Sequence, residues 1–218
     1  MNLPTYFVLN GFRLHTVGIF ITIAFFVSLF ILWQEGKKDG FGEEKLFDLF
    51  ITGLFSGLLF SRIFFAFDSN LGLYSAFYSV IRFWTPGLSS LGFLLGFFIP
   101  VLLFAKKWRW SVYRILDILS LSFSLGMSVI FLGLIAYYKQ FTFLFLFSGY
   151  LLMFAALSIL RRKALSGLVF SIFVLINTLV GVILLPGRFS LIFYVCLFTI
   201  SLVNFLTRIN KHMDNKEK

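Results

Sequence analysis

The sequence is poor in charged residues. They make up 13% of the chain, whereas a soluble domain carries about 25%. Because 60% of the residues are hydrophobic and the mean hydropathy is +0.97, too few polar side chains remain to cover a water-exposed surface. The low charge therefore excludes a soluble globular protein and predicts one that is embedded in a membrane.

Cysteine and histidine are also scarce, which limits the chemistry. Cys196 is the single cysteine, so no intramolecular disulfide can form. Neither His15 nor His212 has a second histidine or a cysteine at metal-ligand spacing. The sequence also lacks a Gly-x-Ser-x-Gly motif. We therefore expect no metal, no other cofactor and no ordinary nucleophilic catalytic apparatus.

Long apolar runs are what the sequence does contain. A helix needs about 20 apolar residues to cross about 30 Å of hydrocarbon. The runs predict an all-α polytopic membrane helix bundle of about seven transmembrane helices: Leu14–Trp33, Leu46–Phe67, Gly87–Ala105, Tyr113–Tyr137, Phe141–Leu160, Leu165–Leu185 and Phe189–Thr207. We expect one transmembrane domain over residues 1–209 and a polar cytoplasmic tail over residues 210–218.

The basic residues are distributed unequally between the two faces of the membrane. Alternate loops and the C-terminal tail contain 14 Lys and Arg residues, and the opposite loops contain four. Since Lys and Arg concentrate in cytoplasmic loops, the N-terminus is predicted outside and the C-terminus inside. The net charge of +10 is thus a topology signal, and we expect no nucleic-acid partner.

Arg62 is a charged residue inside the second predicted span. A charge in a span is costly and is a functional hypothesis by default. The side chain lies about 8 Å from the outer end of the span at 1.5 Å per residue. Two interpretations remain open: Arg62 extends to the outer head groups, or its guanidinium holds a lipid phosphate.

Asp117 and Asp48 each lie near the start of a span that enters from the cytoplasm. A carboxylate near the start of a helix is stabilised by the helix dipole. We therefore expect both residues to be structural.

Small residues recur at helical spacing in two neighbouring spans. Gly53 and Gly57 lie in the second span, and Gly92 and Gly96 lie in the third. This spacing lets helix backbones approach closely in lipid. It predicts a contact between the second and third spans, with a dimer as the alternative.

The segment from Trp84 to Gly92 combines Pro, Gly and Ser at the outer end of a span. Irregular backbone at membrane depth is tolerated where it is buried in protein or lines a wet cavity. The segment is therefore a candidate site, and an ordinary outer loop followed by a capped helix is the alternative.

Four stretches resemble the bacterial prolipoprotein diacylglyceryl transferase family, over roughly the first 140 residues. They are Leu14-His15-Thr16-Val17-Gly18, Gly57-Leu58-Leu59-Phe60-Ser61-Arg62-Ile63, Gly87-Leu88-Ser89-Ser90-Leu91-Gly92-Phe93-Leu94-Leu95-Gly96 and Asp117-Ile118-Leu119. In the second stretch, Arg62 matches an arginine of the family pattern.

The resemblance implies a multi-pass protein of the bacterial cytoplasmic (inner) membrane. The family transfers diacylglyceryl from phosphatidylglycerol to the lipobox cysteine of prolipoproteins and releases glycerol phosphate. The implied partners are phosphatidylglycerol and, as a further class, prolipoprotein signal peptides. The candidate lipid-binding residues are Arg62, His15, Ser89, Gly92 and Arg188, and the expected packing residues are Gly53, Gly57, Gly87, Gly96 and Asp117.

The sequence departs from the family pattern at positions that carry chemistry. Leu91 stands where the family has a histidine, and the fourth-span signature falls on Ile130–Lys139. Within that stretch only Gly133 matches, and Phe131 replaces an arginine. The leading hypothesis is a divergent transferase-like protein with no catalytic residue assigned.

Two alternatives to a divergent transferase remain. One is a catalytically inactive member that binds phospholipid or a signal peptide, or scaffolds a partner. The other is a small-solute transporter, for which Asn177 and Thr178 are the only interior polar pair.

Overall fold

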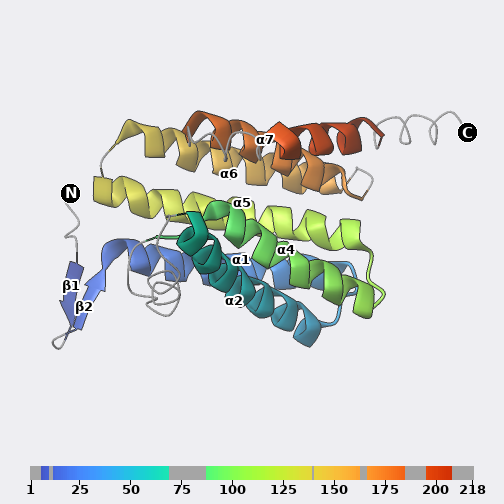
Figure 1. Cartoon of the computed structure of the whole chain (residues 1–218), viewed down its shortest axis with the longest axis horizontal. Helices are drawn as coiled ribbons and strands as arrows, with labels where there is room; N and C mark the ends of the chain where they lie inside the picture. The colour runs from blue at the N-terminus through green and yellow to red at the C-terminus, as the bar shows by residue number, and fades with distance from the viewer. Residues whose placement is uncertain are drawn as a thin grey trace, which may run out of the picture. The chain divides into compact units, whose positions relative to one another are not determined.

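The computed structural model of the chain describes residues 6–9, 12–68, 87–138, 140–162, 166–184 and 195–207. Seven helices occur within these residues. They are α1 (Thr16–Lys38), α2 (Glu43–Asp68), α4 (Ser90–Lys107), α5 (Val112–Tyr138), α6 (Phe141–Arg161), α7 (Leu168–Leu184) and a C-terminal helix, Val195–Thr207 (Figure 1).

The helices confirm the predicted all-α polytopic membrane fold. Five of them, α1, α2, α4, α5 and α6, are long and apolar enough to cross a membrane. Within the described residues, α7 and the C-terminal helix are shorter. The predicted orientation, with the N-terminus outside, stays a prediction.

A β-hairpin precedes the first helix and corrects the start of the first predicted span. Strands β1 (Tyr6–Leu9) and β2 (Phe12–His15) pair antiparallel, with Tyr6 opposite His15. Leu14 and His15 therefore belong to a strand, and the helix begins at Thr16. Apolar content alone did not distinguish these extended residues from helix.

The chain divides into two compact units. One contains residues 1–38 and 113–218, and the other contains residues 39–112. The prediction of one transmembrane domain over residues 1–209 stays a prediction.

The larger unit has a core formed by α5, α6 and α7. Its buried members are Leu121, Tyr150, Met153, Leu157 and Val169. Helix α1 packs on α5, where the Ser28 hydroxyl donates a 3.0 Å hydrogen bond to the carbonyl of Ser122. The fit of these two helices is close, because a Cβ on Gly133 of α5 would lie 2.5 Å from the Cβ of Phe20.

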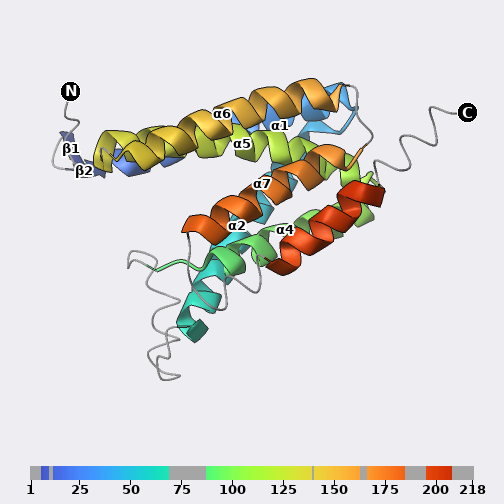
Figure 2. The same cartoon turned by 90° about the horizontal axis from the view of Figure 1, so that it is seen from above.

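The C-terminal helix lies beside α7 (Figure 2). Polar side chains join the two helices. The Ser201 hydroxyl donates to the Ser171 carbonyl, and the Asn204 amide donates to the Ser171 hydroxyl, each at 2.8 Å. Interhelical hydrogen bonds of this kind stabilise helix association in lipid.

The smaller unit is built on α2 and α4, which pack against each other. Ser89 caps the start of α4, because its side chain accepts a hydrogen bond from the Gly92 N–H. Pro100 lies inside α4. Membrane helices tolerate an internal proline because neighbouring groups can satisfy the freed backbone.

Candidate functional site

The contact between α2 and α4 is formed at their glycines. A Cβ on Gly92 would lie 2.6 Å from the Phe60 carbonyl oxygen and 2.9 Å from the Ser61 Cα. A Cβ on Gly96 would lie 2.6 Å from the Ser56 carbonyl oxygen. Cβ atoms do not occupy such short distances, so glycine at these two positions allows the helix backbones to touch.

On α2, Gly53 and Gly57 leave room for aromatic rings of α4 at the same contact. A Cβ on Gly53 would lie 2.9 Å from the ring of Phe97, and one on Gly57 would lie 3.1 Å from the ring of Phe93. The contact therefore combines glycines on one helix with large side chains on the other.

Serine hydrogen bonds fix the segment before α4 to α2. The Ser61 hydroxyl donates to the Ser89 carbonyl at 2.8 Å, and the Ser89 N–H donates to the Ser61 carbonyl at 3.2 Å. Five residues earlier on α2, the Ser56 hydroxyl donates to the Gly96 carbonyl of α4 at 2.6 Å. Ser56 is not among the residues predicted from the sequence; its signal there is a small polar residue directly before Gly57.

Gly87 gives the same segment its backbone conformation. Its φ is +129°, a region that side chains disfavour. A Cβ there would also lie 2.3 Å from the ring of Phe65 on α2. Glycine is thus required at this position for both backbone and packing reasons.

Arg62 follows Ser61 on α2, at the end of the helix that faces this segment. It is 3% exposed, and Ser61 is 1% exposed. The site therefore contains two serines with defined hydrogen bonds and the start of α4, and the buried Arg62 directly follows one of these serines on α2. The positive end of the α4 dipole lies at the same end of the unit, so the local electrostatics favour an anion.

Two further candidate lipid-binding residues were predicted from the sequence, His15 and Arg188. His15 is exposed at the end of β2, in the larger unit. Arg188 lies outside the described residues, as do Lys139 and the segment from Trp84 to Pro86. The structure thus brings Ser89 and Gly92 into contact with α2 at Ser61, the residue directly before Arg62.

Asp117 has structural partners that its sequence position does not indicate. It is 4% exposed, and its carboxylate accepts the Gly167 N–H at 2.6 Å and the Phe170 N–H at 2.8 Å. Asp117 lies on α5, but it caps the start of α7. The expected stabilisation by its own helix dipole is therefore not its main interaction.

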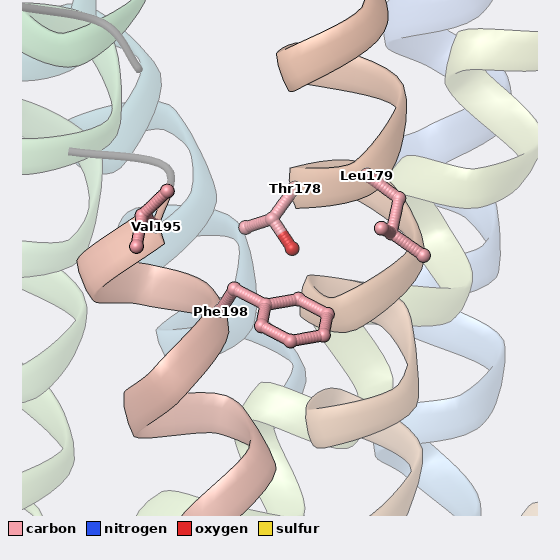
Figure 3. Close-up of a pocket in the computed structure, with 4 residues that line it drawn as sticks. All are labelled: Thr178, Leu179, Val195 and Phe198. Atoms are coloured by element: carbon pink, nitrogen blue, oxygen red, sulfur yellow. The ribbon is translucent and has the colours of Figure 1, made fainter. Parts of the chain in front are cut away.

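Within the described residues, no group of three or more His, Cys, Asp or Glu side chains is arranged to hold a metal ion. A hollow with a volume of about 220 Å³ lies between α7 and the C-terminal helix. Figure 3 shows its lining, which consists of Thr178, Leu179, Val195 and Phe198. The Thr178 hydroxyl donates to the Leu175 carbonyl at 2.8 Å, so this one polar side chain of the lining is bonded within its own helix.

The fold and the site define a polytopic membrane protein with a buried arginine beside a close glycine–serine helix contact. Residues 4–136 match the prolipoprotein diacylglyceryl transferase family, and the chain belongs to that family. The matched region includes α1, α2, α4 and most of α5.

Three relatives show the extent of the similarity, and each is named phosphatidylglycerol–prolipoprotein diacylglyceryl transferase. The Clostridium tetani protein is 24% identical over 123 residues, which cover 56% of this chain and 49% of the relative. The Limosilactobacillus reuteri (strain DSM 20016) protein is 27% identical over 118 residues, which cover 54% and 42%. The Thermotoga maritima protein is 23% identical over 125 residues, which cover 56% and 42%. The chain spans about half the length of these relatives.

Proposed function

We propose that the chain is a diacylglyceryl transferase-like protein of the bacterial cytoplasmic membrane that binds phosphatidylglycerol beside the α2–α4 contact. The observation that carries the proposal is the burial of Arg62, which directly follows Ser61 of the α2–α4 contact and lies within the family-matched region. The relatives are named for phosphatidylglycerol and prolipoprotein. We propose that this chain binds the same lipid.

The chemistry of Arg62 supports an anionic head group. A guanidinium in a membrane span costs about 2.5–3.5 kcal/mol on insertion scales, so it is retained where it has a role. Its planar fork matches two oxygens of a phosphate and keeps its charge at every physiological pH. Ser61 and Ser89 fix the backbone beside it. Ser89, Gly92, His15 and Arg188 stay candidates for further lipid contacts.

Lipid binding without transfer is the second candidate function. Phe131, which stands where the family resemblance places an arginine, stacks on Tyr150 with ring centroids 5.4 Å apart and on Phe143 at 6.4 Å. Its environment is an apolar core, which supports a structural role there. Phe131 cannot bind a phosphate, and Leu91 cannot transfer a proton.

The polar contacts of Asn177 weaken the transporter alternative. Its side-chain oxygen accepts the Tyr150 hydroxyl at 2.6 Å, and its amide donates to the Phe173 carbonyl at 2.8 Å. Both groups thus serve helix packing, and Thr178 bonds within its own helix.

Retention of phosphatidylglycerol tests the lipid-binding proposal. The purified protein is extracted in mild detergent, and co-purified lipid is quantified by mass spectrometry for wild type and Arg62→Gln. We expect Arg62→Gln to lose most of the retained phosphatidylglycerol and Arg62→Lys to keep part of it. Arg162→Gln, which removes an exposed charge on another helix end, is the matched control. Equal retention by wild type and Arg62→Gln would overturn the proposal.

Complementation separates the two candidate functions. A bacterium depleted of its own transferase is supplied with this chain and with a lipobox reporter protein. Diacylglyceryl on the reporter thiol supports transfer, whereas unmodified reporter with good membrane expression and normal lipid retention supports binding alone.

A further inference from the structure

A second group of basic residues lies at the opposite end of the α2–α4 unit. Lys45, near the start of α2, is about 25 Å along the helix from Arg62 at 1.5 Å per residue. We name this group the aromatic–basic cluster, and it consists of Phe41, Lys45, Phe104, Lys106, Lys107, Trp108, Arg109 and Trp110.

The backbone at the end of α4 holds Arg109 in an unusual conformation. The Trp110 N–H donates to the Ala105 carbonyl at 2.8 Å, and the Arg109 N–H donates to the Lys106 carbonyl at 3.2 Å. This pair of bonds is a Schellman motif, in which the residue at the position of Arg109 is usually glycine. Arg109 has a φ of 55°, which is strained for a residue with a Cβ.

An arginine retained where glycine would relax the backbone points to a use for its side chain. Arg109 is exposed, as are Lys106 and Lys107 close before it. The end of α4 therefore presents three cations to its surroundings.

Aromatic rings at the end of α4 contact one another and a fourth cation, Lys45. Trp108 stacks on Phe104 with ring centroids 4.7 Å apart and contacts Trp110 at 4.9 Å. Trp110 in turn contacts Phe41, in the connection before α2, at 4.6 Å. The ammonium of Lys45 lies 5.9 Å from the centroid of Trp108, within the range of a cation–π interaction. Tryptophan side chains are enriched at the head-group level of membranes.

The acidic residues at the start of α2 are stabilised locally. Glu43 and Glu44 lie in the first turn of this helix, where the helix dipole favours a negative charge. In the sequence, no Asp or Glu occurs between Asp68 and Asp117. The stretch 69–116, which contains the end of α4, thus has basic residues and no acidic residue.

We infer that the aromatic–basic cluster binds the phosphate of an anionic phospholipid at the membrane surface where α4 ends. The Arg109 fork and the ammonium groups of Lys106 and Lys107 donate to the phosphate oxygens. The Trp108 and Trp110 rings lie at head-group depth. This site is separate from the one proposed at Arg62, since it lies at the other end of the same helices.

Lipid titration of the full chain tests the inference. The protein in detergent micelles is titrated with phosphatidylglycerol or with phosphatidylcholine, and bound lipids are counted by native mass spectrometry. Arg109→Gly removes the cation and relieves the backbone, so the variant is expected to fold at least as well as wild type. We expect its phosphatidylglycerol affinity to fall about five-fold, the effect of one surface cation on an anionic lipid.

Three further variants distinguish a specific site from a general attraction between basic side chains and anionic lipid. Arg109→Lys keeps the charge but loses the planar fork, so it is expected to keep only part of the affinity. Trp108→Leu, which removes the ring under Lys45, is expected to weaken binding without removing a charge. Arg162→Gly removes an exposed cation at the end of α6 and is expected to leave binding unchanged.

The outcomes are decisive in either direction. Unchanged phosphatidylglycerol binding by Arg109→Gly would overturn the inference. So would an equal loss in Arg162→Gly, or an equal loss of phosphatidylcholine. If Arg109→Gly still lowers the phosphatidylglycerol affinity in an Arg62→Gln background, the two lipid sites are independent. In that case the inference stands even if the lipid-binding proposal at Arg62 is overturned. If Arg109→Gly no longer changes the affinity in the Arg62→Gln background, the two sites are not separate.

Discussion

The carboxylate of Asp117 on α5 accepts the backbone N–H of Gly167 at 2.6 Å, across a separation of 50 residues. Its second oxygen accepts the Phe170 N–H, so one side chain satisfies two donors at the start of α7. The first turn of a helix leaves its N–H groups without partners inside the helix. Asp117 therefore links the family-matched part of the chain to the helices that follow it.

Removal of this cap is expected to destabilise the protein. Asp117→Ala should lower the free energy of unfolding by about 2–3 kcal/mol, because hydrogen bonds to a charged acceptor are worth more than neutral ones. Thermal unfolding in detergent, followed by intrinsic fluorescence, measures the change. Asp117→Asn keeps one acceptor oxygen and should lose less. Asp48→Asn, at an exposed position on α2, is the control, and equal effects at the two positions would refute the capping role.

The close contact at Gly92 predicts intolerance of even one methyl group. Gly92→Ala should destabilise the protein by about 1–3 kcal/mol, the usual range for overpacking, because its Cβ would lie 2.6 Å from the Phe60 carbonyl oxygen. Gly149→Ala on α6 is a matched control, since nothing lies within 4 Å of the Cβ position. That control should be neutral or slightly stabilising. A Gly92→Ala protein that unfolds like Gly149→Ala would contradict the contact.

Much of the fold could be predicted from the sequence because membrane helices are specified locally. Apolar length and polar breaks predicted each of the seven helices found in the described residues, and the Gly-x-x-x-Gly spacing predicted a contact that the structure places between α2 and α4. The hairpin before Thr16 was missed, because a short apolar strand has no period that separates it from a helix start.

The missed parts of the structure depend on partners far away in the sequence. Nothing near Asp117 indicates that Gly167 is its partner, and Glu35 pairs with Arg161 across a separation of 126 residues. Such pairs follow from the packing of helices, which a single sequence does not specify.

The ion pair between Glu35 at the end of α1 and Arg161 at the end of α6 is expected to couple these two helices. The two side chains are only 18% and 13% exposed, and Glu35 also pairs with Lys38 of its own helix. A double-mutant cycle with Glu35→Gln and Arg161→Gln should give a coupling energy of about 1 kcal/mol in the unfolding free energy. A second cycle, with Glu35→Gln and Arg162→Gln at the exposed neighbouring arginine, should give no coupling energy. A coupling that is the same for both arginines would show that the interaction is only a general charge effect.

The hydrogen bond from the Tyr150 hydroxyl to the Asn177 side chain, 2.6 Å long, predicts an asymmetric response to mutation. Tyr150→Phe should cost about 0.6–1.7 kcal/mol, the range of such bonds between membrane helices, because Asn177 loses a donor in an apolar setting. Asn177→Leu should cost a similar amount, because the hydroxyl loses its acceptor. The double variant should be nearly as stable as wild type, since replacing both partners by apolar groups can be close to neutral. Unfolding in mixed detergent micelles measures all three. If the two single effects add in the double variant, the pair does not join α6 to α7 as the structure indicates.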